Sequence, residues 1–158
     1  MQNKKINRID IYNLACELRT AMNSAYKNGV FDNEVELQQF PRGSCVMSSC
    51  FLGEYLMEHG ITTRYVNRTY YYGKTSWESQ AHTWLEINPR LIVDITGDQF
   101  KDNPILMNYN IPVYVGDYSE FYNLFESTPN GEHELTKGNI LSSEERILYN
   151  EIKKYLQK

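Results

Sequence analysis

Cysteine is scarce in this chain of 158 residues, which contains only Cys16, Cys45 and Cys50. An odd number of cysteines without paired spacing argues against a disulfide framework and favours reduced thiols. Long apolar runs are missing as well. No stretch approaches the ~18 apolar residues of a membrane span, and residues 1–5 lack the apolar run of a signal peptide. We therefore expect a cytoplasmic protein without a membrane partner.

The chain also lacks an excess of basic residues. It contains 16 Lys and Arg and 20 Asp and Glu, which give a net charge of -4. This balance argues against a strongly basic nucleic-acid binder. The hydrophobic fraction of 41% excludes a disordered chain, and the length suits one domain spanning residues 1–158. The 13 tyrosines fit half-buried positions on a sheet with one wet face better than a base-stacking platform, which would need basic neighbours.

Two amphipathic helices are predicted in the first part of the chain. Apolar residues recur at helical spacing over residues 10–28, and Gly29 follows as a helix stop. A second helix is predicted over residues 45–59, before Gly60. Its expected buried side consists of Met47, Cys50, Phe51, Tyr55 and Leu56.

The pattern then changes to short runs of β-branched and aromatic residues, which predict an antiparallel sheet. The expected strands are residues 62–72, 80–87, 91–96 and 111–115. A short helix is predicted over 117–126, a loop over 128–139, and a closing helix at Ser142 and Glu145, which form a capping box. Helices followed by a sheet indicate an α+β fold.

Three residues at the edges of these predicted elements are candidates for a catalytic site. Cys45 opens the second predicted helix, His82 lies in the 80–87 strand, and Asp94 lies in the 91–96 strand. A thiol with a free pKa of about 8.5 is mostly protonated at neutral pH, and the positive end of a helix dipole favours its thiolate. Thiol, imidazole and carboxylate together are the groups required for a cysteine nucleophile with a base and an orienting group.

Each of these residues also has a structural interpretation. A free cysteine is most often a small buried hydrophobe, and this is how we interpret Cys16 and Cys50. His82 shares a strand face with Trp84 and Glu86, where a histidine can simply be solvated or hydrogen bonded.

The strand register offers a test of the three-residue hypothesis. His82 opposite Asp94 gives a constant residue sum of 176, which pairs Glu86 with Arg90 around a three-residue turn. A two-residue turn at Asn88 would move Asp94 to the other face unless a bulge intervened. The hypothesis therefore predicts an odd-length turn or a bulge.

The chain resembles the papain-like, transglutaminase-like superfamily of cysteine peptidases, transglutaminases, deamidases and arylamine acetyltransferases. The resemblance covers residues 39–100 and rests on three segments, Gly43-Ser44-Cys45, Ala81-His82-Thr83-Trp84-Leu85-Glu86 and Val93-Asp94-Ile95-Thr96-Gly97-Asp98-Gln99-Phe100. It is similar to small bacterial proteins with these motifs. It implies a helix carrying the cysteine packed on an antiparallel sheet, with Cys45, His82 and Asp94 as a catalytic triad.

The resemblance leaves the oxyanion donor open between a side-chain amide and backbone N–H groups. Gln39 and Gln38 lie six and seven residues before Cys45, and Gln99 lies five residues after Asp94. The two earlier glutamines are equally interpreted as surface residues, and Gln99 as a structural one. One preorganised donor can lower the barrier by roughly 3 kcal/mol.

Metal binding is the competing chemical interpretation, because Cys, His and carboxylate are also zinc ligands. The sequence has no close-spaced ligand pair, and we interpret His59 and His133 as exposed residues. We expect no metal and no cofactor.

Two classes of function follow from the pattern. The first is a cysteine-dependent acyl-transfer enzyme acting on an amide, with a protein or peptide as substrate; the sequence does not choose among peptidase, deamidase and transglutaminase. The second is a non-catalytic or regulatory binding module on the same fold, such as a phage- or toxin-associated protein.

Overall fold

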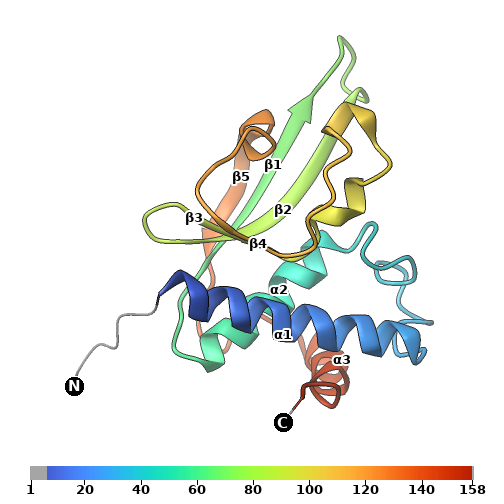
Figure 1. The fold of residues 1–158 in the computed structure, drawn as a ribbon, viewed down its shortest axis with the longest axis vertical. Coiled ribbons are helices and arrows are strands. Elements are labelled where there is room, and N and C mark those ends of the chain that lie inside the picture. The colour runs from blue at the N-terminus through green and yellow to red at the C-terminus, as the bar shows by residue number, and fades with distance from the viewer. Residues whose placement is uncertain (1–6, 158) are drawn as a thin grey trace.

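A computed structural model describes residues 7–157 of the chain. The fold is α+β, with three α-helices packed on a five-stranded antiparallel sheet of order β4-β3-β2-β1-β5 (Figure 1). No helix among the described residues is long and apolar enough to cross a membrane. Residues 1–5, from which the absence of a signal peptide was argued, lie outside the described residues.

Three of the four predicted helices are confirmed. Helix α1 (Arg8–Lys27) begins two residues before the predicted start, because the Asn7 side chain caps it by accepting the amide of Asp10. Helix α2 (Cys45–Glu58) begins at the predicted residue. Helix α3 (Ser143–Lys153) opens with the predicted capping box of Ser142 and Glu145.

Four strands lie at or near their predicted positions. They are β1 (Arg64–Tyr71), β2 (Ser79–Ile87), β3 (Leu91–Asp94) and β4 (Tyr114–Gly116). The last begins three residues later than predicted. The short helix predicted over 117–126 is wrong, because only a single 3-10 turn forms there, over Tyr122–Leu124.

A fifth strand, β5 (Glu126–Glu134), occupies most of the segment predicted as a loop. It pairs with β1 alone and its register shifts between Val66 and Arg68. An edge strand tolerates Pro129 and Gly131, since its outer backbone groups need no partner. Proline and glycine are typical of loops, which is why a loop was predicted here. The prediction is wrong because the segment is an edge strand.

The sheet is covered on both faces. Leu85, Leu91 and Val93 face the helices and join their core. The opposite face, which carries Val66, Trp84 and Ile92, is covered by side chains of the segment 97–125. The predicted wet face is therefore wrong, and β2 is buried without interruption from His82 to Glu86.

Helix α2 packs over β2, with Gly53 facing the sheet. A Cβ atom at Gly53 would lie 2.5 Å from Cδ1 of the Leu135 side chain, which would have to shift, and 3.7 Å from Cδ1 of Leu85 on β2. Cys45 is the first residue of this helix.

Candidate functional site

The turn between β2 and β3 places His82 and Asp94 on one face. The pairs Leu85 with Val93 and Ile87 with Leu91 leave a three-residue turn of 88–90, so the predicted odd length is confirmed. The residue sum is 178, however, and the predicted pairing of His82 with Asp94 is wrong. If this register is continued along the strands, Asp94 lies opposite Trp84 and therefore diagonally opposite His82. At that separation the two side chains can still contact each other.

The predicted pair of Glu86 and Arg90 is also wrong. Glu86 is buried and accepts hydrogen bonds from Arg64 at 2.9 Å and from the indole N–H of Trp84 at 3.2 Å. The Tyr118 hydroxyl donates to the same carboxylate, and the guanidinium of Arg90 lies over the Tyr118 ring. This network fixes Trp84, which packs against the imidazole of His82 with ring centroids 5.6 Å apart.

His82 and Asp94 form a fully buried pair. The imidazole Nε2 lies 2.7 Å from Oδ2 of Asp94, and the side chains are 0% and 1% exposed. Tyr122 donates its hydroxyl to the same Oδ2 at 2.8 Å, while the backbone amide of Thr96 donates to Oδ1 at 3.0 Å. The carboxylate is thus held on both oxygens, which fixes the orientation of the imidazole.

Burial alone would disfavour both charges, but their mutual attraction prevails. Burial lowers the pKa of His82, and the charge of Asp94 together with hydrogen bonds to Asp94 and Cys45 raises it to about 10. Burial raises the pKa of Asp94, and the imidazolium with the Thr96 and Tyr122 hydrogen bonds brings it below its ordinary value. The pair is therefore an imidazolium with a carboxylate.

Aromatic rings surround the imidazole of His82. Phe100 meets it edge-on at a centroid distance of 5.0 Å, and Phe125 and Phe121 lie at 5.8 and 6.0 Å. These rings exclude water from the ion pair, which strengthens its electrostatic interaction.

Cys45 is the first residue of α2. The turn before it uses Gly43 at a φ of +72°, a conformation that side chains rarely adopt. The Ser44 hydroxyl donates to the Pro41 carbonyl at 2.7 Å and makes no capping bond to the helix. The backbone amides of the first turn are therefore left without a side-chain cap beside the sulfur, where they favour a thiolate.

An open edge of β2 brings Cys45 to His82. Strand β3 pairs with β2 only from Leu85 to Ile87, so the backbone of Thr83 has no strand partner on that side. Helix α2 takes its place: the Ser49 hydroxyl donates to the Thr83 carbonyl at 3.4 Å, and Cys45 is hydrogen bonded by the Thr83 backbone amide. The sulfur thereby reaches around the edge of β2 to the face that carries His82.

The pKa of Cys45 is lowered from that of an ordinary thiol. Burial raises it, but the hydrogen bond and charge interaction with His82, with the hydrogen bonds from Thr83, outweigh burial. Nε2 of His82 contacts Asp94, so the interaction with Cys45 falls to Nδ1, which the Gln99 amide nitrogen also approaches at 3.4 Å. Cys45, His82 and Asp94 form one continuous line of interactions.

The other two cysteines are half-buried rather than fully buried, so the predicted deep burial of Cys16 and Cys50 is wrong in degree. Cys50 packs against the helix-side core. Burial and the charges of Glu145 and Glu36 raise its pKa to about 11, the opposite direction from Cys45.

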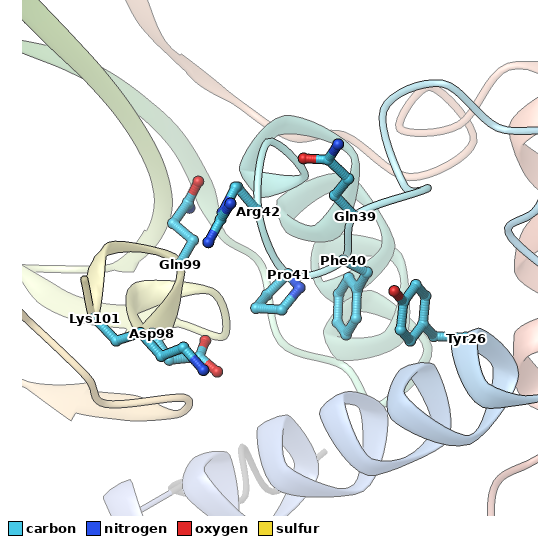
Figure 2. A pocket seen from close by; sticks show the side chains of 8 residues that line it. All are labelled: Tyr26, Gln39, Phe40, Pro41, Arg42, Asp98, Gln99 and Lys101. Atoms are coloured by element: carbon cyan, nitrogen blue, oxygen red, sulfur yellow. The ribbon is translucent and has the colours of Figure 1, made fainter. Parts of the chain in front are cut away.

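The three candidate oxyanion donors are placed very differently. The Gln38 amide donates to the Asp32 carbonyl at 2.9 Å, which holds it in the preceding loop. Gln39 lies across Arg42 from Gln99 in the view of Figure 2. Gln99 lies in the site, with Nε2 3.4 Å from Nδ1 of His82 and Oε1 accepting the Gly43 amide at 3.3 Å. Of the three, Gln99 is the amide that contacts His82.

Two hollows border the site and share Arg42 and Gln99. One, of about 350 Å³, lies on the side of Tyr26 and Phe40 and is shown in Figure 2. The other, of about 510 Å³, lies on the side of Gln80 and Asp102. The two hollows thus lie on either side of the loop that precedes Cys45.

Among residues 7–157, no group of three or more His, Cys, Asp and Glu side chains is placed to hold a metal ion. His59 and His133 are exposed, as predicted. His59 contacts the Tyr55 carbonyl and His133 stacks on Tyr65.

The aromatic residues that contact His82 and Asp94 were not predicted from the sequence. Tyr122 contacts Asp94, and Phe121 and Phe125 contact His82. Their signal was present as an aromatic residue at every third or fourth position from Tyr118 to Phe125. That spacing marks one shared apolar side, whether or not a regular helix forms.

Comparisons with protein-family models, with curated proteins and with solved structures find no match to this chain.

Proposed function

We propose that this chain is a cysteine-dependent acyl-transfer enzyme with a papain-like, transglutaminase-like fold, in which Cys45, His82 and Asp94 are the catalytic triad. The observation that carries the proposal is the buried ion pair of His82 and Asp94, whose second imidazole nitrogen is left for a thiol of lowered pKa. Buried charges are costly, and titratable groups with strongly shifted pKa values cluster at functional sites.

The chemistry follows from the protonation states. The Cys45 thiolate attacks the carbonyl carbon of an amide and forms a tetrahedral oxyanion. The imidazolium of His82 then gives its proton to the leaving amine as the C–N bond breaks, which leaves a thioester on Cys45. Neutral His82 takes a proton from water or from an amine, which attacks the thioester and releases the thiolate. Asp94 stabilises each imidazolium and stays ionised.

The oxyanion has donors within reach. The backbone amide of Cys45 lies in the uncapped first turn of α2, and the Gln99 amide adjoins His82. In the resting site Gln99 Nε2 also donates to the Thr96 carbonyl at 3.0 Å, so the backbone amide is the donor that requires no rearrangement.

An extended polypeptide is the substrate class that fits best. Backbone groups of alternate residues along a strand point to the same side, so those of Ala81 point the same way as those of Thr83. Ala81 is exposed, and its carbonyl accepts the side-chain amide of its neighbour Gln80 at 2.8 Å. An incoming backbone N–H could replace that amide and lie beside Cys45.

Acylation of Cys45 tests the proposal. The full chain is mixed with p-nitrophenyl acetate at pH 7, and intact and peptide mass spectra are taken over time. We expect one acetyl group on Cys45 that is lost on adding a primary amine. Cys50→Ala should acylate normally. Folded Cys45→Ala should lose the adduct, and slow, equal acetylation of all three cysteines would instead favour the binding module.

A further inference from the structure

The hollow shown in Figure 2 is lined by aromatic side chains on one side and mainly by polar and charged side chains elsewhere. Tyr26 and Phe40 form one side, and Arg42, Gln99 and Lys101 lie around the remainder. Its connection to the site is direct, because Phe40 and Arg42 belong to the turn that precedes Cys45 and Gln99 adjoins His82.

The single carboxylate that lines this hollow is already neutralised. Asp98 accepts a two-fold hydrogen bond from Arg19 at 2.8 Å on each oxygen, and this Arg19 is 6% exposed. The same guanidinium donates to the Ile95 carbonyl at 2.7 Å and lies over the Phe40 ring. Both carboxylate oxygens of Asp98 are thus bound by Arg19 of α1, so Asp98 is not available to neutralise a second cation.

Arg42 and Lys101, in contrast, form no ion pair among the described residues. The hollow is therefore lined by two cations that have no ion-pair partner, although the whole chain has a net charge of -4. The neighbouring hollow differs, because Arg42 and Asp102 are the charged residues that line it and their charges balance in number. The excess of positive charge is thus specific to the side of Tyr26 and Phe40.

From this arrangement we propose that the hollow is a substrate subsite for a side chain with a carboxylate on an apolar stem, such as glutamate. The stem would pack on Phe40, and Arg42 would bind the carboxylate with its planar pair of N–H donors, with Lys101 adding charge at the rim. The inference rests on the proposed function, because it concerns the selection of substrate for Cys45.

A pair of isosteric electrophiles tests the subsite. The reagents are the chloroacetyl derivatives of glutamic acid amide and of glutamine amide, which differ only in charge at the end of the side chain. Second-order rate constants for alkylation of Cys45 are measured by peptide mass spectrometry at pH 7. The measured quantity is the rate with the glutamate reagent divided by the rate with the glutamine reagent.

In the wild-type protein we expect a ratio of about fivefold, which is near the upper end for an exposed charge pair, falling as salt is added. Arg42→Gln and Lys101→Gln should each lower the ratio. Lys137→Gln, which removes an exposed cation between β5 and α3, is the matched control for net charge and should leave it unchanged.

The outcomes separate the two proposals. A ratio near one in the wild type, with Cys45 still alkylated much faster than Cys50, overturns the subsite and leaves the proposed function standing. A ratio that falls equally in all three variants also overturns it, since the preference would then be a property of net charge. Slow alkylation of Cys45 by both reagents overturns the proposed function and the subsite with it.

Discussion

Replacing Tyr122 by phenylalanine should separate the stability of the site from its reactivity. The Tyr122 ring is fully buried, and its hydroxyl donates to the Asp94 oxygen that also receives His82. Phenylalanine keeps the ring and removes that donor, together with the oxygen that accepts the Tyr109 hydroxyl at 3.3 Å. Asp94 retains the His82 contact on Oδ2 and the Thr96 amide on Oδ1.

The expected loss follows from the charge of the acceptor. A hydrogen bond to a charged group contributes about 1.5–3 kcal/mol, more than a neutral one. For a chain of this length, this corresponds to a melting temperature lower by about 3–12 °C. Reactivity should not fall, because a carboxylate with one donor fewer is more basic and attracts the imidazolium at least as strongly.

Thermal melts and iodoacetamide alkylation of Cys45 at pH 7 measure the two quantities. Tyr114→Phe is the matched control: Tyr114 stacks on Tyr122, but its hydroxyl donates to the Asp117 carbonyl away from the triad. We expect this control to lose less stability. A Tyr122→Phe protein as stable as the wild type, or one whose Cys45 reactivity collapses, would refute the assigned role of the hydroxyl.

Two further predictions concern the cysteines and the pH dependence of stability. Cys50→Ala should lower the free energy of unfolding by about 1 kcal/mol and leave acylation intact. Cys45→Ala should abolish acylation with little loss of stability. Thermal melts and mass spectra of both variants measure these effects. The raised His82 pKa gives stability that is fully present below about pH 6.5 and is lost as pH rises through about 10. In Asp94→Asn, denaturant titrations over this window should show a shallower decline, since the asparagine no longer holds the charged imidazole; an equally steep decline would argue against the ion pair.

The sequence was sufficient for the helices and for the residue types of the site. Periodic apolar residues, the capping box at Ser142 and the glycine stops are local signals, and local signals are read without knowledge of tertiary contacts. The odd length of the β2–β3 turn was predicted because only that parity keeps His82 and Asp94 on one face. Its exact register was not, because moving a three-residue turn by one position, from 87–89 to 88–90, preserves the parity.

The missing parts depend on contacts between distant segments. Strand β5 exists because β1 offers it an edge, and nothing in the run around Pro129 announces that partner. The covered second face depends on where the segment after Asp94 folds back, so the contact of Tyr122 with Asp94 could not be derived from spacing alone. Likewise, the buried Arg19 was hidden within a helical pattern and depends on Asp98 for its charge partner.

The most direct test of the triad is the pH dependence of alkylation at two cysteines of the same wild-type molecule. Iodoacetamide is applied briefly between pH 5 and 11, and modification of Cys45 and Cys50 is followed by peptide mass spectrometry. The account predicts that Cys45 reacts with an apparent pKa below the 8.5 of a free thiol, and that Cys50 becomes reactive only toward pH 11. Equal profiles for the two cysteines, or a Cys45 profile centred at or above 8.5, would contradict it.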